Sequence, residues 1–291
     1  MSSADASIAL GRPPAEADPA GAAPTPRVIV PSKRRVRIAD MWRSREVMWI
    51  VAMRDIKVKY KQSALGPIWL FLQPLGMLAA VSVAFSAVVG VDTGGVPYLL
   101  FALAGLCVWN FIQLVLSAGT LVLIANHTLI RRSACPRIAL MNAQITSNLP
   151  FFAVILATTL VGTLFSEGFG LEILALPVVV VWLMAFTWGL LLISASISAR
   201  FRDSVSAVPL VLQAGIFLAP VGYPADRGGP TTEALLALNP VTGLIEALRW
   251  SVLGTSVELY VIAIALGWTV LIVVAGWRTF GRMETRFADF I

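Results

Sequence analysis

The chain has 291 residues, of which 58% are hydrophobic and only 13% are charged. Soluble globular proteins carry roughly 25% charged residues, so this composition excludes a soluble protein and indicates an integral membrane protein. The net charge of +6 does not indicate nucleic-acid binding, because twelve of the 22 Lys and Arg residues precede the first long apolar run, where such residues set membrane topology. With one histidine and two cysteines, we expect no disulfide framework, no metal site and no cofactor bound by this chain.

The first 31 residues are rich in Ala and Pro and contain no apolar core. This composition is typical of disorder, and it lacks the apolar region of a signal peptide. We therefore expect a disordered cytoplasmic tail over residues 1–31, a cytoplasmic interface region over residues 32–67 and a transmembrane domain over residues 68–291.

The interface region contains a cationic, amphipathic segment with helical spacing. Its apolar residues share one face and its cations share another. The apolar set is Trp49, Ala52, Met53, Ile56 and Tyr60, and the cationic set is Arg54, Lys57 and Lys61. Asp55 precedes Lys59 by four residues, which is the favourable order for a helical ion pair. Such a helix is expected to lie in the membrane surface, with its cations toward anionic lipid or a partner. A helix that only anchors orientation fits the same pattern.

Six apolar runs approach the roughly 20 residues that a membrane-spanning helix needs. They are Ile68–Val91, Pro97–Ala125, Met141–Phe165, Ile173–Ser198, the shorter Val205–Val221, and Val257–Phe280. Cations alternate with acids in the loops between them. Counting the N-terminal region, 20 of the 22 Lys and Arg residues fall on one side, and only Arg227 and Arg249 fall on the other. The positive-inside rule then places both termini in the cytoplasm.

The region Gly222–Ser256, before the last run, is too long for a simple loop and too apolar to be solvated. Two short helical patterns, Thr231–Leu238 and Val241–Leu253, meet at Asn239–Pro240, and neither is long enough to span. This is typical of a re-entrant or interfacial pair, at about residues 223–256. The predicted fold is therefore an all-α integral membrane protein with six transmembrane helices, an N-terminal amphipathic interfacial helix and a re-entrant helical pair before the last span.

Within that pair, Glu246 and Arg249 are three residues apart and are predicted to face each other. They would form a neutralised pair that lets the hairpin lie near the interface, or they would contact substrate.

The chain lacks the motifs of an energy-converting enzyme. No lysine follows a glycine, so there is no Walker A motif, and neither GxSxG nor HExxH occurs. The central parts of the six runs contain no Asp, Glu, Lys or Arg, which argues against proton or sodium coupling. Energy for uphill transport must therefore come from a partner. The amide, hydroxyl and aromatic side chains in these runs suit a glycan conduit, although interhelical packing and lipid contact account for them equally.

Several segments carry motifs in a fixed order. They are RDIKVKYKQSALGPIWLFLQPL (54–75), NHTLIRRSACPR (126–137), SARFRD (198–203), LAPVGYP (218–224), LNPVTGLIEALRW (238–250) and the C-terminal FGRMETRFADFI. In this order they resemble the ABC-2 type permeases that export polysaccharides, the Wzm and teichoic-acid exporter group, over about Trp42–Ile291. The long tail before Val28 departs from the usual short start of that family.

The resemblance implies the missing energy source. In that family two permease copies pair with two separate ATPase subunits, which bind ATP and Mg. The cargo would be a polyprenyl-pyrophosphate-linked cell-envelope polysaccharide, such as galactan or an O-antigen-like glycan, crossing the cytoplasmic (inner) membrane. The chain would then be a transporter subunit and not an enzyme. Its partners would be the ATPase, a second copy of itself, the lipid-linked glycan and membrane lipid, and not nucleic acid.

The resemblance also implies roles for particular residues. ATPase coupling would fall to Leu129, Arg131, Arg132, Pro136, Arg137, Arg202 and Asp203. The lipid pyrophosphate would be met by Arg54, Lys57, Lys59 and Lys61. The outer gate would contain Pro220, Tyr223, Asn239, Pro240, Glu246 and Arg249. No catalytic residue is implied.

Three alternatives remain at this point. An ABC-2 exporter of lipid or drug would share the same architecture. A membrane-embedded polyprenyl-sugar transferase would need acidic or His residues gathered near the interface, but Glu167, Glu172 and Glu246 are scattered. A passive channel would need a selectivity element, and the sequence shows no ring of charge.

Overall fold

The chain folds into helices joined by short turns. The computed structural model describes residues 44–61, 66–89, 93–132, 135–166, 168–225 and 229–284, and these ranges contain no strand. The chain divides into two units, Met1–Ser32 and Lys33–Ile291, and every described residue belongs to the second. The expected tail over residues 1–31 lies outside the described residues. The all-α prediction is confirmed for the part that is described.

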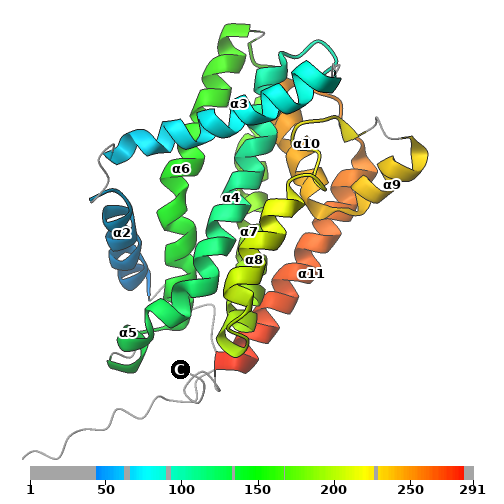
Figure 1. The fold of residues 1–291 in the computed structure, drawn as a ribbon. Coiled ribbons are helices and arrows are strands. Elements are labelled where there is room, and N and C mark those ends of the chain that lie inside the picture. The colour runs from blue at the N-terminus through cyan, green and yellow to red at the C-terminus, as the bar shows by residue number, and fades with distance from the viewer. Residues whose placement is uncertain are drawn as a thin grey trace, which may run out of the picture. The chain divides into compact units, whose positions relative to one another are not determined.

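Figure 1 shows the order of the helices along the chain. They are α2 (Arg45–Lys61), the 3-10 helix η2 (Gly66–Ile68), α3 (Trp69–Val89), α4 (Tyr98–Ala125), α5 (His127–Arg132), α6 (Arg137–Ser166), the 3-10 helix η3 (Leu171–Ala175), α7 (Leu176–Arg200), α8 (Ser204–Gly215), α9 (Pro230–Leu238), α10 (Pro240–Leu253) and α11 (Leu259–Glu284).

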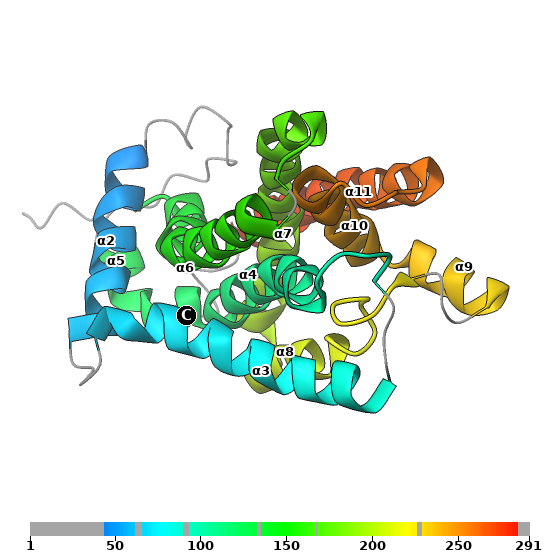
Figure 2. The same cartoon turned by 90° about the horizontal axis from the view of Figure 1, so that it is seen from above.

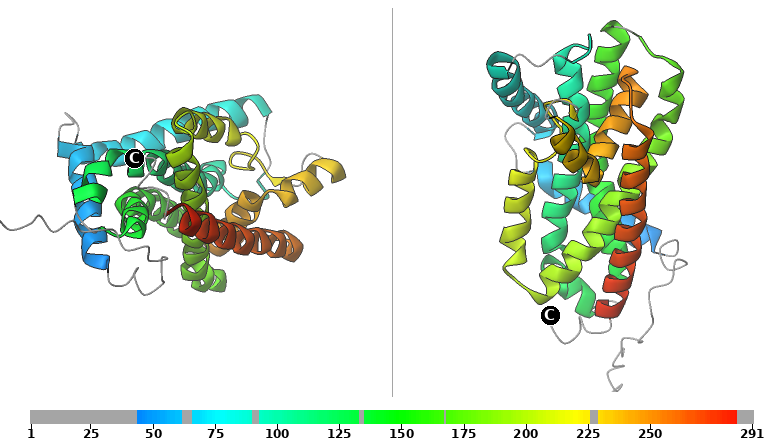
Figure 3. Two further views of the ribbon diagram at one scale, coloured as in Figure 1. Left: turned by 90° about the horizontal axis from the view of Figure 1, so that it is seen from below. Right: turned by 90° about the vertical axis from the view of Figure 1, so that its right-hand side faces the viewer.

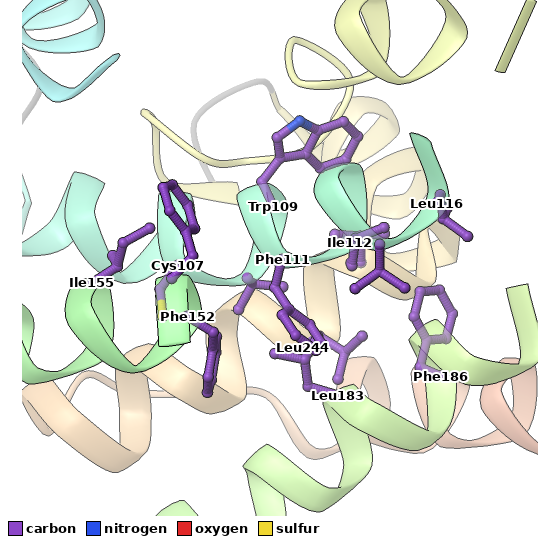
Figure 4. Close-up of a cluster of buried hydrophobic side chains, with 14 of the residues drawn as sticks. Cys107, Trp109, Phe111, Ile112, Leu116, Phe152, Ile155, Leu183, Phe186 and Leu244 are labelled. Carbon is purple, nitrogen blue, oxygen red and sulfur yellow. The ribbon is translucent and has the colours of Figure 1, made fainter. Parts of the chain in front are cut away.

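Helix α4 forms the centre of the core. Nineteen of its 28 residues are buried, because α3, α6, α7, α8 and α10 all pack against it. Phe111 of α4 meets Phe152 of α6 with ring centroids 5.0 Å apart. Leu183 and Phe186 of α7 and Leu244 of α10 belong to the same buried cluster (Figure 4). A helix that is apolar on every side needs this cover, and the sequence of α4 is almost uniformly apolar.

Helices α7 and α11 make the largest helix–helix contact, and glycines allow it. A Cβ atom on Gly189 of α7 would lie 2.9 Å from backbone atoms of Val273 in α11. A Cβ atom on Gly276 of α11 would lie 2.5 Å from the carbonyl oxygen of Gly189. Small residues at membrane-helix contacts let two backbones approach closely, so these two positions set the distance between α7 and α11.

Helices α2 and α3 lie across the other helices. Seen from above, α4, α6 and α7 are viewed nearly end-on, whereas α2 and α3 extend along their lengths (Figure 2). Helix α2 packs on α6, and α3 crosses α6 and α4. Among the described side chains of α3, Pro74 and Leu78 are buried, whereas Phe71 and Leu75 are exposed. Most of the described apolar side chains of α3 are therefore uncovered within this chain.

Four helical segments among the described residues are long and apolar enough to cross a membrane. They are Tyr98–Ala125, Arg137–Ser166, Leu171–Arg200 and Leu259–Met283. They match the second, third, fourth and last predicted spans. In the first predicted span α3 is a helix of 21 residues, but Phe71–Ala80 is the part that can be assessed as apolar among the described residues, so this span stays a prediction. The fifth, α8, ends at Gly215 instead of continuing to Val221, and its 12 residues measure about 18 Å. The prediction of six spans is thus confirmed for four.

The two short helices predicted before the last span are present. Each begins one residue earlier than expected, because Pro230 and Pro240 occupy first helical positions, where the missing N–H costs nothing. Asn239 caps α10 by accepting a hydrogen bond from the backbone N–H of Val241 at 3.1 Å. Gly254 ends α10 with a left-handed φ of 66°. Helix α10 is buried against α4, α7 and α11, so it belongs to the core.

The bundle has two distinct ends. Helix α5, the turn between α7 and α8, and the C-terminal end of α11 lie at one end, which we call the α5 end (Figures 1 and 3). Helix α9, the turn before α4 and the beginning of α11 lie at the other, the α9 end (Figure 1). The residues with predicted roles divide between these ends.

Candidate functional site

Near the α5 end, Arg54 joins α2 to the turn between α4 and α5. Its Nη2 donates to Oδ1 of Asn126 at 2.9 Å and also forms an ion pair with Asp55 at 2.8 Å. The amide nitrogen of Asn126 donates in turn to the carbonyl oxygen of Val122, one helical turn earlier. Because this bond fixes the orientation of the amide, the Oδ1 atom of Asn126 is directed toward α2 as an acceptor.

Two further bonds join α2 to α6. Gln144 Nε2 donates to Oδ2 of Asp55 at 3.0 Å, and Lys59 Nζ donates to Oδ1 of Asn148 at 3.0 Å. The amide nitrogen of Asn148 donates to the carbonyl of Gln144, so its orientation is fixed in the same way as that of Asn126. We call these three cross-helix bonds, from Arg54, Asp55 and Lys59, the α2 docking contacts.

The predicted ion pair between Asp55 and Lys59 is wrong, because both side chains bond elsewhere. Asp55 pairs with its neighbour Arg54 and accepts from Gln144, while Lys59 turns toward Asn148. The side chain of Lys59 is exposed as a whole, but its ammonium end meets the buried Asn148. This desolvation lowers the pKa of Lys59, and the nearby Asp55 carboxylate opposes the shift.

The buried face of α2 differs from the predicted one. Val51 and Ala52 are buried, whereas Trp49 is 57% exposed and does not share their face. The predicted face assumed that apolar residues alone would pack, but the polar Asp55 and Lys59 also turn toward α6.

The four cations predicted to meet pyrophosphate fall into two pairs. Arg54 and Lys59 are engaged in the α2 docking contacts. Lys57 and Lys61 are exposed, and within the described ranges they form no hydrogen bond or ion pair. Only this second pair is available to an anion without first breaking a contact inside the chain.

Most of the predicted coupling residues lie together on α5 and at the start of α6. Leu129 packs against the hydrophobic core, and Arg131 and Arg132 form the last two residues of α5. Pro136 directly precedes α6 and Arg137 begins it, and both are half-buried. Arg202 and Asp203 are exposed in the turn between α7 and α8, at the same end of the bundle but on different elements. Helix α5 is thus a short helix between α4 and α6, and the coupling role of these residues stays a prediction.

At the α9 end, three side chains hold the irregular segment that follows α8, one from α4, one from α10 and one from the residue between α9 and α10. We call this segment, residues 216–223, the 216–223 turn. Asn239 Nδ2 donates to the carbonyl oxygen of Leu218 at 3.1 Å, and Arg249 Nη2 donates to that of Val221 at 2.7 Å. Tyr98 Oη donates to the carbonyl of Gly222 at 3.0 Å. The turn is therefore fixed through its main chain.

The other residues of the predicted outer gate lie in or beside this turn. Pro220 is buried within it, and the hydroxyl of Tyr223 donates back to the carbonyl of Phe217 at 3.1 Å. Pro240 begins α10 directly after Asn239, and Glu246 is half-buried on α10. The structure thus brings the six predicted gate residues to one end of the bundle, and their role as a gate stays a prediction.

Arg249 is the most deeply buried charge among the described residues, with 3% of its surface exposed. Its Nε donates to the carbonyl oxygen of Phe101 at 3.2 Å, and its guanidinium carbon lies 3.4 Å from the centroid of the Phe101 ring. The predicted pairing with Glu246 is wrong as a direct ion pair, although Glu246 is close enough to interact electrostatically. Stacking on an aromatic face and main-chain carbonyls compensate the buried charge instead.

The sequence did not indicate the acceptors of these bonds. Asn126, Gln144 and Asn148 occur among many other amides in the apolar runs. Only the i−4 bonds to their own helices make Asn126 and Asn148 acceptors for α2, whereas Gln144 donates to Asp55. Every residue has a main-chain carbonyl, so the sequence does not show that the carbonyls of Phe101 and Val221 are the ones that accept from Arg249. Gly105 is a partial signal for the acceptor at Val221, because a glycine inside a helix can mark the close approach of another backbone. A Cβ at Gly105 would lie 2.5 Å from the carbonyl oxygen of Val221.

The described residues form helices and no strand, with four apolar helices of spanning length and a buried central helix, which indicates an integral membrane protein. A family model for the ABC-2 type transporter matches residues 46–253, from the start of α2 to the end of α10. The chain therefore belongs to the ABC-2 type transporter family, which makes it a membrane component of a transporter.

Named relatives sharpen this assignment. An O-antigen export system permease protein RfbA from Myxococcus xanthus is 26% identical over 215 residues, which cover 73% of this chain and 82% of the relative. A protein of the same name from Klebsiella pneumoniae is 24% identical over 251 residues, covering 84% of this chain and 95% of the relative. A second from Klebsiella pneumoniae is 23% identical over the same length. The resemblance to polysaccharide export permeases is thus confirmed at the level of the family.

Proposed function

We propose that this chain is the membrane-spanning permease subunit of an ABC exporter that moves a cell-envelope polysaccharide out across the cytoplasmic membrane. The observation that carries the proposal is the ABC-2 match over residues 46–253 together with relatives that are named O-antigen export permeases. The cargo would be a glycan linked to polyprenyl pyrophosphate, with a galactan as one candidate. Lipid or drug export is the alternative within the same family.

The proposed topology has six spans and two cytoplasmic termini. Helices α3 and α8 would complete the six in the assembled transporter, since both have exposed apolar residues such as Phe71 and Leu210 that this chain does not cover. A second copy of the chain and membrane lipid would cover them. Residues 1–31 would be a cytoplasmic tail, residues 32–67 the interface region and residues 68–291 the transmembrane domain, with α9 and α10 as a re-entrant pair facing outward.

Energy would enter at the α5 end, which this topology places in the cytoplasm. Two ATPase subunits, carrying ATP and Mg, would dock on α5, with Arg131 and Arg132 as contacts. Arg202 and Asp203, exposed at the same end, would form a second contact. A movement of α5 would reach α2 directly, because Asn126 at the start of α5 accepts from Arg54.

The lipid pyrophosphate would meet α2. Lys57 and Lys61 project from it without partners among the described residues, so they can form charge-assisted bonds to an anion. Arg54 and Lys59 would hold the helix in place while Lys57 and Lys61 bind.

The proposal is tested by co-expressing the chain with a candidate ATPase and purifying the complex. We expect equal numbers of the two chains, two of each, and loss of surface polysaccharide when this chain is deleted from its host.

The double charge reversal Arg131→Glu, Arg132→Glu should abolish export while the protein still inserts into the membrane. Arg278→Glu, an exposed arginine near the end of α11, is the matched control and should export normally. Recovery of the chain without any stoichiometric ATPase, or unchanged export in the double variant, would contradict the proposal.

A further inference from the structure

A cavity of about 540 Å³ lies at the α9 end of the bundle. Its wall is built by the residues before α4, by α9 and α10, and by the turn that leads into α11. Its volume lies within the range of roughly 300–1,000 Å³ that small-molecule sites occupy. Segments that lie far apart in the sequence thus converge on one partly open cavity.

The wall of this cavity is mostly polar. Three carboxylates line it, Glu233, Glu246 and Glu258, together with the hydroxyls of Thr93 and Tyr260. The hydroxyl of Tyr260 donates to Oε1 of Glu233 at 3.0 Å, which fixes one of the carboxylates. Within the described residues no group of three or more His, Cys, Asp or Glu is arranged to hold a metal ion. The carboxylates therefore offer hydrogen-bond acceptors to the cavity.

Two buried polar side chains in the wall have unused hydrogen-bonding capacity. Arg249 uses Nε and Nη2 for carbonyl oxygens, and its Nη1 donates to no residue that the structure describes. Thr242 is fully buried in α10, and its hydroxyl has no partner among the described residues. A buried polar group without a partner costs roughly 1–3 kcal/mol, so the hydroxyl of Thr242 would gain from a ligand that supplies one. Nη1 of Arg249 can donate to the same ligand.

We propose that this cavity binds a neutral sugar residue of the exported glycan on the outer side of the membrane. A ligand for this wall must donate to carboxylates and accept from a guanidinium, which an array of sugar hydroxyls does. Three carboxylates against one guanidinium disfavour an anion, and an apolar ligand would take these charged groups out of water without offering them a hydrogen bond. The inference rests on the proposed function, since it assigns a step to the same cargo.

The site would hold the glycan after it has crossed the membrane. Arg249 connects the cavity to the 216–223 turn through Val221, and Glu246 lies one helical turn before it on α10. A sugar bound to these two residues would therefore contact the element that holds the predicted outer gate. The site would thus favour outward movement by retaining sugar residues that have emerged.

The test uses the full chain with its ATPase, reconstituted in nanodiscs to avoid detergents that carry sugar headgroups. The probes are D-glucose, D-galactose, D-mannose and L-rhamnose at millimolar concentration, followed by saturation-transfer difference NMR. We expect at least one sugar to bind, and Glu246→Gln to weaken its apparent affinity about tenfold, as the loss of a charged hydrogen-bond acceptor implies. Glu172→Gln, a half-buried carboxylate on η3 outside the cavity wall, is the matched control and should bind as the wild type does.

Thr242→Val separates binding from folding. Because the hydroxyl of Thr242 has no partner in the unliganded chain, this nearly isosteric change should leave the melting temperature unchanged or higher. The same change should weaken sugar binding several-fold. Fragments of the polysaccharide that the host exports should compete with the bound sugar, which ties the site to the cargo.

Three results would overturn the inference. They are no signal from any of the four sugars, equal binding by Glu246→Gln and Glu172→Gln, and failure of the host polysaccharide to compete. The proposed function is judged separately, by surface polysaccharide and by the ATPase complex. A chain that supports export but binds no sugar overturns this inference alone, whereas a chain that binds sugar but never supports export overturns the proposed function.

Discussion

The chain fixes its cations in two different ways at its two ends. Near the α5 end, Arg54 and Lys59 are bound by the side-chain amides of Asn126 and Asn148, and Arg54 is also paired with Asp55. At the α9 end, Arg249 is bound by main-chain carbonyls and by the face of an aromatic ring. The first group lies at the surface of the bundle, and the second is in its core.

The contacts of Arg54 and Lys59 can be exchanged for other partners, whereas those of Arg249 cannot. Exposed charge contacts contribute roughly 0–1 kcal/mol each, and their partners can be replaced by water or by another anion. A buried arginine bound to carbonyls has no such substitute, and its loss leaves polar backbone groups unpaired. We infer that α2 is held lightly enough to shift during transport, whereas the 216–223 turn moves only if Arg249 moves with it.

The largest expected effect is that of Arg249→Met. It would leave the carbonyls of Phe101 and Val221 without their donor and remove the charge stacked on the Phe101 ring. We expect a loss of about 3 kcal/mol in the free energy of unfolding, measured by denaturation of the purified protein. Arg249→Lys keeps the charge but not the forked geometry and should be intermediate. If Arg249→Met melted at the wild-type temperature, the cation at the α9 end would not be held more tightly than those near the α5 end.

Gly105→Ala is next, because it tests the same region without removing a charge. The added Cβ would lie 2.5 Å from the carbonyl oxygen of Val221 and 2.9 Å from Nη2 of Arg249. Overpacking of this kind costs about 1–3 kcal/mol, against a gain of about 1 kcal/mol for replacing a helical glycine with alanine. Gly267→Ala on α11 is the control, since nothing lies within 4 Å of its Cβ, and it should be neutral or stabilising. Equal stability of the two variants would argue against a tightly held turn.

These two positions also mark what the sequence could and could not predict. The all-α class, four spans and the α9–α10 pair followed from run lengths and from Pro240 and Asn239, because helix signals are local. The partner of Arg249 could not be predicted, since an i+3 spacing favoured Glu246 whereas tertiary packing presented carbonyls from residues 28 and 148 positions away. The end of α8 at Gly215 could not be predicted for a related reason. The apolar run continues to Val221, whereas the helix ends and the backbone turns.

A smaller effect is expected for the double change Gln144→Leu, Asn148→Leu. It removes two of the α2 docking contacts and leaves Asp55 and Lys59 to water, at a cost of about 1 kcal/mol or less per bond. Global unfolding should change little, but hydrogen exchange at the α2 amides should become several-fold faster. Thr146→Val on the same helix is the control, because its hydroxyl bonds only within α6. If α2 exchanges equally slowly in both variants, its polar contacts do not hold it.

The smallest effect on stability is expected on α2 itself, where the two kinds of cation lie side by side. Lys57→Gln with Lys61→Gln should not change the melting temperature, because neither side chain has a partner among the described residues. The pair should nevertheless lower substrate-stimulated ATPase activity of the assembled transporter several-fold, since the two donors proposed to meet the lipid pyrophosphate are lost. Arg54→Gln with Lys59→Gln is the matched comparison: it should loosen α2 in hydrogen exchange, because both residues are engaged in docking. If the two double variants give the same exchange and the same ATPase rates, the cations of α2 form one uniform charged surface and the division between holding and binding residues does not exist.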